Sequence, residues 1–258
     1  MSDLVLTTPG GLSGFFGKLP ARRDFVTSAL PHAFTEPWHN WLEDGLAGCQ
    51  DRLGATWLDA YLNMPIWRFA LAGCVCGESA VAGIMIPSLD RVGRHFPLTI
   101  AALVSAPFAP TELASSFSNW YREAEPLALS CLNAEFEFES FERQVATLPF
   151  EICAGAVPTR RDPPGRPAWF STPQAQGWQF PSNADIDPLR IFALAFDRTT
   201  ARHLGAYSLW WTTGSERVPP TLAVSPGLPN AIAFTALLDG DWDEWGWCDS
   251  PSFQLIGE

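Results

Sequence analysis

The chain has 258 residues, of which 47% are hydrophobic, and it carries a formal net charge of −12 at pH 7. A chain of this length can bury roughly three quarters of the surface that its unfolded form exposes, so the composition favours one large folded domain. The negative charge opposes nonspecific binding to nucleic acid, because that binding depends on cationic groups that displace counterions from phosphates. We therefore expect no nucleic acid among its partners.

The apolar runs are too short to cross a membrane. The longest runs, residues 69–77 and 80–87, are separated by Glu78 and Ser79 and fall short of the roughly 20 residues that a span requires. Residues 1–11 carry an acid where a secretory signal has cations, and they lack a long apolar segment. These features predict a cytoplasmic protein that does not insert into a membrane.

The six cysteines are dispersed and form no CxxC pair. Because a chain of this length does not need disulfides to be stable, we expect buried thiols. On a strand, Cys74 and Cys76 would face the same side, but no second Cys or His pair follows at zinc-ligand spacing. The four histidines also lie far apart, so we expect neither a metal nor a cofactor.

Residues 34–62 have the spacing of amphipathic helix, because large apolar side chains recur every three or four positions. Thr35 and Asp51 are candidate N-caps, and Gly54 weakens the middle of the segment, so it predicts one helix or two.

After residue 62, the helical spacing of the apolar residues ends. Residues 66–76 and 79–88 are short apolar runs with little charge, which predicts two strands joined in a tight hairpin and buried on both faces. Residues 98–106 predict a third strand. The charged segment between the second and third strands is then a loop.

In the second half of the chain, one helix is expected to open at Pro110 and another to span residues 133–148, although alternating Glu and Phe also fit a strand there. Residues 156–190 contain too many prolines for a regular element and predict a long surface excursion. Three further strands and a short helix are expected at residues 191–196, 207–211, 222–224 and 229–238. Mixed helices and strands with hairpin joins predict an α/β sandwich whose sheet is mixed.

The motifs of common active sites are incomplete. A phosphate loop at residues 11–18 fails, because Leu12 occupies a glycine position and Leu19 occupies the position of the Ser or Thr. The acidic segment that begins at Asp239 resembles a calcium loop, but Glu244 stands where glycine is needed. We expect a solvated acidic segment there, with exposure of its tryptophans to a partner as the alternative.

Two segments, residues 14–26 and 88–99, place charged side chains between apolar ones and predict one recognition surface. The charged cluster comprises Lys18, Arg22, Arg23, Asp24, Asp90, Arg91, Arg94 and His95. Alternatively, Asp24 and Asp90 pair with arginines only to hold the loops in place. General acid/base chemistry by His95 with Asp24 or Asp90 is a further possibility, which requires that they be close.

At these segments the chain resembles the TagF/ImpM family, which is associated with type VI secretion. The resemblance rests on GKLPARRDFV (17–26), PWHNWLEDGL (37–46), WL with YLNMPIWRFAL (57–71), IPSLDRVGRHFPLT (86–99) and SLWW (208–211). Their order makes the match more specific than any single motif. One departure is Arg23, which stands where the family usually has glycine and adds a cation.

The resemblance implies a three-layer α/β/α sandwich, formed by residues 1–258 as a single TagF-like domain. The hairpin joins predict that its central sheet is mixed but largely antiparallel. It also implies a cytoplasmic accessory protein that represses type VI secretion after translation. The implied partner is a forkhead-associated scaffold protein, with a link to a serine/threonine phosphatase pathway and no enzymatic activity. The alternative that the residues leave open is a phosphate-ligand binder or hydrolase that uses the Arg/Asp/His cluster.

Overall fold

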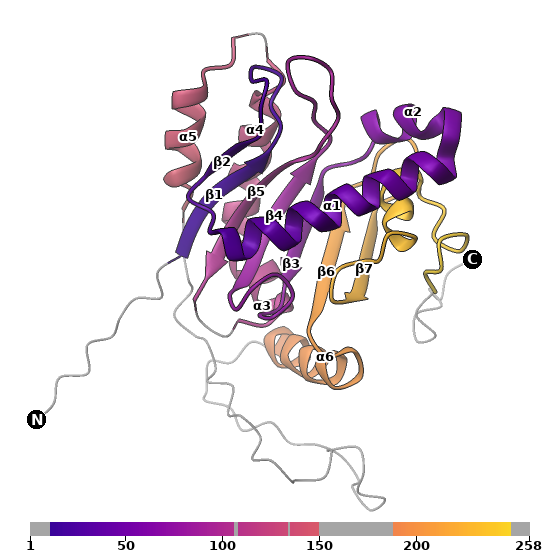
Figure 1. The fold of residues 1–258 in the computed structure, drawn as a ribbon. Helices are drawn as coiled ribbons and strands as arrows, with labels where there is room; N and C mark the ends of the chain where they lie inside the picture. The colour runs from indigo at the N-terminus through magenta and orange to yellow at the C-terminus, as the bar shows by residue number, and fades with distance from the viewer. Residues whose placement is uncertain (1–10, 106–107, 134, 150–187, 249–258) are drawn as a thin grey trace, which may run out of the picture.

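Seven strands form one sheet at the centre of the computed structural model, which describes residues 11–105, 108–133, 135–149 and 188–248 (Figure 1). The strands are β1 Gly11–Gly17, β2 Val26–Ser28, β3 Trp67–Leu71, β4 Ala80–Ile86, β5 Leu98–Val104, β6 Tyr207–Thr212 and β7 Thr221–Pro226. Their order is β2-β1-β5-β4-β3-β6-β7, and each neighbouring pair is antiparallel. The largely antiparallel sheet is confirmed, but the described strands include no parallel pair that would make it mixed.

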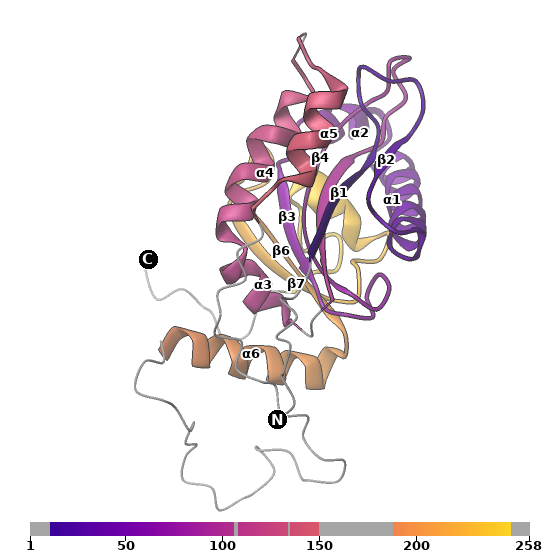
Figure 2. The same cartoon turned by 90° about the vertical axis from the view of Figure 1, so that its left-hand side faces the viewer.

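Helices cover both faces of this sheet, as the turned view shows (Figure 2). One face carries α1 His32–Leu53, η1 Gly54–Thr56, α2 Trp57–Leu62, η3 Ala233–Thr235 and α7 Ala236–Asp239. The other carries α3 Pro110–Ser116, α4 Ser118–Ser130 and α5 Phe138–Ala146, while α6 Pro188–Leu204 contacts α3 and β6 at one end of the sheet. The three-layer α/β/α sandwich is therefore confirmed.

The central strands β4 and β5 are buried along their whole length because helices pack on both of their faces. This explains why their sequences are continuous apolar runs rather than alternating ones. On the α1 face, the Trp38 ring packs against Phe69 and Trp210, and its indole N–H donates to Thr99 Oγ1 at 2.9 Å. Full burial of one such side chain stabilises the fold by roughly 1.5–3 kcal/mol.

Most elements expected from periodicity are present. The segment 34–62 forms two helices separated by a short 3₁₀ turn, and the hairpin, the third strand and the helix within 133–148 are all confirmed. The predicted N-caps are wrong. Helix α1 begins after Pro31, so Thr35 and Asp51 both lie inside it.

The predicted strand at 191–196 is wrong, because these residues lie within helix α6. A six-residue apolar run has no periodicity that separates a buried strand from a helix. The later strands are confirmed as β6 and β7, and the final short helix as η3 and α7. The Pro-rich excursion at 156–190 falls almost entirely outside the described residues.

Strands β1 and β2 were not expected from the sequence. β1 contains three glycines, a composition more typical of a loop than of a strand. At two of these glycines, another segment of the backbone lies so close that a side chain would not fit. A Cβ atom on Gly14 would lie 2.1 Å from the Ser28 carbonyl oxygen, and one on Gly17 would lie 2.1 Å from that of Pro97. Glycine is therefore used here for packing within the sheet rather than for binding a phosphate.

The cysteines are only partly as expected. Cys49, Cys76 and Cys131 are buried thiols, and burial raises their pKa values to about 11, 12 and 12. Cys74 and Cys248 are instead exposed, and Cys74 lies in the turn between β3 and β4 rather than on a strand. No disulfide joins the cysteines in the described part of the chain.

The three tryptophans of the acidic C-terminal segment are half-buried rather than freely exposed. Trp242 and Trp247 pack against the core on the α1 face, and the Trp245 indole N–H donates to Asp239 Oδ2 at 2.8 Å. Contacts within the protein therefore cover much of the aromatic surface that a partner-binding site would have to expose.

Candidate partner-binding surface

The topology brings the two charged segments to the same end of the sheet. β1 pairs with β5 so that Phe16 faces Thr99, and β4 pairs with β5 so that Ile86 faces Leu98. The loop that leaves β1 (residues 18–25) and the loop that connects β4 to β5 (residues 87–97) are consequently neighbours. We call these two loops the loop pair.

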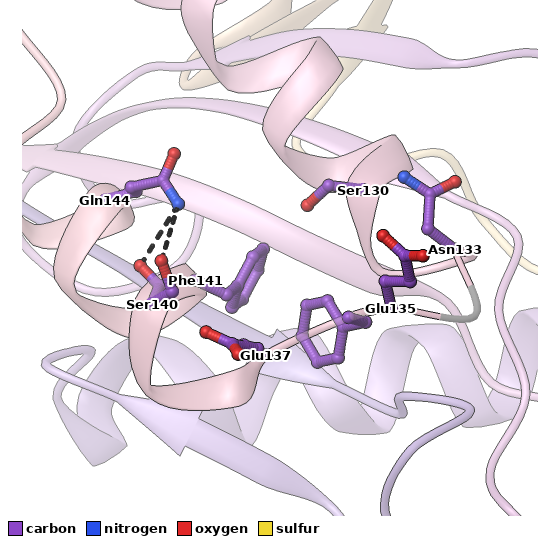
Figure 3. A pocket seen from close by; sticks show the side chains of 8 residues that line it. Ser130, Asn133, Glu135, Glu137, Ser140, Phe141 and Gln144 are labelled. Atoms are coloured by element: carbon purple, nitrogen blue, oxygen red, sulfur yellow. Dashed lines mark hydrogen bonds between the residues drawn. The ribbon is translucent and has the colours of Figure 1, made fainter.

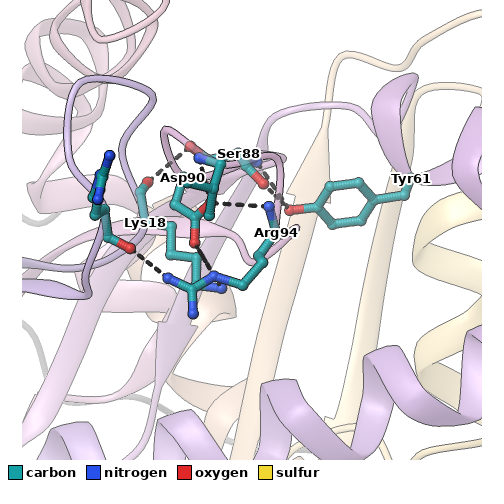
Figure 4. Close-up of polar contacts among 7 residues, drawn as sticks. Lys18, Tyr61, Ser88, Asp90 and Arg94 are labelled. Atoms are coloured by element: carbon teal, nitrogen blue, oxygen red, sulfur yellow. Dashed lines mark hydrogen bonds and ion pairs between the residues drawn. The ribbon is translucent and has the colours of Figure 1, made fainter.

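Asp90 is the centre of the loop pair, and none of its surface is exposed. Its Oδ1 accepts hydrogen bonds at 2.9 Å from the backbone N–H groups of Val92 and Arg94. Its Oδ2 accepts one from Arg94 Nε at 2.6 Å and lies 3.4 Å from Lys18 Nζ (Figure 4). The carboxylate thus fills a nest of donors that its own loop and the neighbouring loop provide.

These donors determine the ionisation of Asp90. Burial by itself would raise its pKa, but hydrogen bonds from Arg94, Val92 and Lys18 to the charged form outweigh burial and hold the pKa well below its ordinary value. Asp90 is therefore a carboxylate at neutral pH. A group that remains ionised in this way is unsuited to act as a general acid.

Further hydrogen bonds tie one loop to the other. The Arg91 N–H donates to the Arg22 carbonyl oxygen at 2.8 Å, and Arg94 Nη2 donates to that of Arg23 at 2.6 Å. The Ser88 hydroxyl donates to the Lys18 carbonyl oxygen at 2.8 Å. Each of these contacts ends on a backbone carbonyl oxygen of residues 18–23, so they fix the positions of the loops without using the side chains of Arg23 or Arg91.

Tyr61 of α2 points its hydroxyl at Ser88 of the loop pair, as Figure 4 shows. Its hydroxyl donates to the Ser88 carbonyl oxygen at 2.6 Å and accepts from the Ser88 N–H at 3.0 Å. Burial raises the pKa of this phenol, so it stays protonated and able to donate. Sequence reasoning missed Ser88 and Tyr61, because nothing local in the sequence indicates which loop a buried tyrosine reaches.

The predicted site residues fall into distinct environments. Lys18 is buried and paired with Asp90, whereas Arg23, Asp24, Arg91 and Arg94 are exposed. The Arg94 side chain is 59% exposed even though it binds Asp90. Side chains of Arg23, Asp24 and Arg91 form no ion pair with any residue that the structure describes. Pairing of Asp24 with an arginine is therefore not found.

Two members of the predicted cluster point to other neighbours. The Arg22 guanidinium lies 4.2 Å from the centroid of the Phe138 ring and pairs with Glu139 of α5 at 3.7 Å. His95 packs edge-on against the rings of Trp57 and Tyr61. Within the described chain, no carboxylate forms an ion pair with His95, which general acid/base catalysis would require.

Exposed apolar side chains accompany the exposed arginines. Phe25 is 44% exposed and Val92 is 59% exposed. The Phe25 ring is held by Phe16, stacked at 5.7 Å between centroids, and by Phe96, edge-on at 4.8 Å. Both residues flank the predicted charges in the sequence, but exposure of an apolar flank is visible only in the fold.

From Asp90 to Arg94, every backbone N–H group of the β4–β5 turn already has a hydrogen-bond acceptor within the protein. The N–H groups of Asp90 and Gly93 bond to carbonyl oxygens within the turn, and that of Arg91 bonds to the neighbouring loop. Those of Val92 and Arg94 are used by the Asp90 carboxylate. Because phosphate-binding loops direct free backbone N–H groups at their ligand, this turn cannot act as one while Asp90 occupies it.

A cavity of about 590 Å³ lies between the end of α4 and the start of α5 (Figure 3). Its lining consists of two carboxylates, two amides, two serines and two phenylalanines, namely Glu135, Glu137, Asn133, Gln144, Ser130, Ser140, Phe136 and Phe141. Its eight described lining residues include carboxylates but no cation, which makes it unsuitable for a phosphorylated ligand. None of the predicted site residues lines it.

Two further observations concern the described residues only. They contain no group of three or more His, Cys, Asp or Glu side chains arranged to hold a metal. Their helices include none that is long and apolar enough to span a membrane.

Comparison with known proteins identifies the family. The profile of the TagF N-terminal domain, which is type VI secretion system-associated, matches residues 14–148. The crystal structure of PA0076 from Pseudomonas aeruginosa PAO1, at 2.05 Å resolution, is similar to this chain with 38% sequence identity and a TM-score of 0.71. That similarity covers 89% of this chain and 94% of PA0076. No curated protein sequence matches the chain.

The α/β/α sandwich and the matched profile together define the class as a type VI secretion-associated domain protein. The chain belongs to the TagF family. The resemblance first seen in the sequence motifs is therefore confirmed.

Proposed function

We propose that this protein is a cytoplasmic regulator that represses type VI secretion after translation by binding a forkhead-associated scaffold protein through the loop pair. Membership of the TagF family supports the association with type VI secretion. The observation that carries the binding role is the immobilised loop pair, which presents exposed arginines and apolar side chains while the backbone N–H groups from Asp90 to Arg94 are already used. A preorganised surface binds with less loss of conformational entropy.

We also propose that the protein is not an enzyme and that residues 1–258 act as one domain. The phosphate-ligand binder or hydrolase is disfavoured, because Asp90 occupies the donor nest and His95 packs against aromatic rings. A connection to a serine/threonine phosphatase pathway belongs to the same proposal. It would act through the phosphorylation state of the scaffold protein rather than through chemistry at the loop pair.

The test is a titration of the purified protein with the forkhead-associated scaffold protein of its own secretion system. The Arg23→Ala/Arg91→Ala variant removes two exposed side chains whose loss leaves the ties between the loops in place. We expect its affinity to fall at least about tenfold, which corresponds to roughly 1.4 kcal/mol. Arg143→Ala, at an exposed position of α5, is the control.

A secretion assay completes the test in cells. Overproduction of the wild-type protein should reduce type VI secretion, and overproduction of R23A/R91A should not, at equal protein levels. If the scaffold protein binds neither form, or binds both equally, the proposed function is wrong.

A further inference from the structure

The loop pair also indicates what chemistry its partner presents. We infer that the partner docks an acidic segment, in which carboxylates flank at least one apolar side chain, onto Arg23, Phe25, Arg91 and Val92. This inference rests on the proposed function, since it names the chemistry of the partner at the same surface.

The exposed charged side chains of the loop pair are mainly arginines. Arg23 and Arg91 are exposed and form no ion pair with any described residue, and Arg94 remains more than half exposed. The buried charge of Asp90 is already balanced by Lys18 and Arg94, so it does not neutralise the outer arginines. Even with the exposed carboxylate of Asp24, cations outnumber anions in the loop pair, so it is a cationic surface on a chain whose net charge is −12.

This contrast favours an acidic partner in one orientation. Carboxylates approaching elsewhere meet a predominantly negative protein, whereas at the loop pair they meet guanidinium groups. Complementary charge of this kind accelerates encounter and fixes orientation more than it adds affinity. The apolar contacts must then supply much of the stability of the complex.

The apolar part of the surface is suitable for that role. The Phe25 ring packs against Phe16 and Phe96, and its centroid lies 5.0 Å from Lys18 Nζ. Because these contacts already restrict the side chain, it loses little conformational freedom on binding. Val92 projects from the neighbouring loop. Rigid aromatic side chains next to arginines are typical of the residues that dominate binding energy in interfaces.

The satisfied backbone distinguishes carboxylates from phosphate. Recognition of a phosphate group usually combines arginines with several free backbone N–H donors. From Asp90 to Arg94 all of these donors are used internally. The remaining exposed guanidinium groups can each donate hydrogen bonds to one carboxylate of an extended acidic segment, without the convergent donors that a single phosphate needs.

Two experiments test the inference separately from the proposed function. In the first, peptides are selected from a random library on the immobilised wild-type protein and counter-selected on Arg23→Glu/Arg91→Glu. We expect the selected peptides to be rich in Asp and Glu around an aliphatic or aromatic residue. A neutral or basic consensus, or no peptides that discriminate between the two proteins, would overturn the inference whatever the scaffold protein does.

In the second, the scaffold protein is titrated at low and high salt, before and after treatment with a phosphatase. R23E/R91E should bind at least about tenfold more weakly at low salt and lose less affinity than wild type as salt is added. The charge-matched control Arg122→Glu/Arg143→Glu changes two exposed arginines on α4 and α5 and should bind like wild type. Loss of binding after phosphatase treatment would assign recognition to phosphate and contradict the inference.

Discussion

Arg94 Nη2 donates a hydrogen bond to the Arg23 carbonyl oxygen at 2.6 Å, across 71 residues of sequence. The same guanidinium binds Asp90 through Nε. A single side chain therefore connects the anchored carboxylate of one loop to the backbone of the other. The neighbouring Arg91 side chain lacks such a role, although its exposure and chemistry are similar.

We first predict that Arg94→Ala and Arg91→Ala differ. R94A removes two charge-assisted hydrogen bonds, and because the group is more than half exposed we expect a loss of only about 1–2 kcal/mol of unfolding free energy. R91A should change it by less than about 0.5 kcal/mol. Urea unfolding measures both, and hydrogen exchange should show faster opening of residues 18–25 in R94A alone. Equal effects would show that the tie does not hold the loops.

A second prediction concerns pH. The pKa of Asp90 is lower in the folded state than in the unfolded chain, so its contribution to stability is complete above about pH 5. The contribution begins to decline as the pH falls below the ordinary pKa of an aspartate, and it is lost as the pH falls through the lowered folded-state pKa. Asp90→Asn should be less stable than wild type at pH 7, because an amide group faces the surrounding donors. The difference between the two should shrink toward pH 3.5.

Asp24→Asn provides the matched control, since Asp24 is exposed and forms no ion pair with a described residue. Its unfolding free energy should follow that of wild type at every pH. A D90N difference that stayed constant from pH 7 to pH 3.5 would show that the Asp90 charge does not stabilise the fold.

A third prediction follows from the nest of donors around Asp90. Asp90→Ala leaves the Val92 and Arg94 N–H groups, the Arg94 guanidinium and Lys18 Nζ without their carboxylate. Formate or acetate should bind there and raise the Tm of D90A, since a ligand that binds only the folded state stabilises it. Sodium chloride at the same ionic strength should raise it less, and wild type should show no such difference. Identical responses of the two proteins would count against the nest.

A fourth prediction concerns the attachment of α6. Burial raises the pKa of Asp197, although Thr111 and Tyr207 donate hydrogen bonds to its carboxylate. Because the folded-state pKa is raised, ionisation costs stability as the pH rises through it, opposite to Asp90. Asp197→Asn should thus keep or increase the stability at pH 7, by up to about 1 kcal/mol.

Asp197→Ala should instead lose about 1–3 kcal/mol, because the buried hydroxyl of Tyr207 and the half-buried hydroxyl of Thr111 lose their acceptor. Unfolding curves at pH 5 and pH 7 separate the two variants. If D197N were as unstable as D197A at both values, the charge rather than the hydrogen bonding would hold α6.

The candidate site was only partly accessible from sequence. The two segments and their charged residues could be selected, because charges between apolar flanks are unusual and lie next to predicted strands. The arginine that pairs with Asp90 could not be selected from the sequence, because Arg91 and Arg94 lie in the same short segment and have the same chemistry. In the folded turn, where Gly93 has a φ of 87°, it is Arg94 that binds Asp90. The exposure of Phe25 and Val92 could not be predicted from the sequence either.

The sequence alone determined the elements whose apolar spacing repeats over several turns or runs, such as α1, β4 and β5, because burial on one face or on both imposes that spacing. Its ordered motifs also determined the family. Only the tertiary structure decided that the glycine-rich segment 11–17 is a strand and that residues 191–196 are helical, because close backbone packing and helix docking leave no local periodicity. It likewise decided how the charges are divided: Asp90 and Lys18 are buried together where two strand ends meet, while Arg23 and Arg91 remain exposed to solvent.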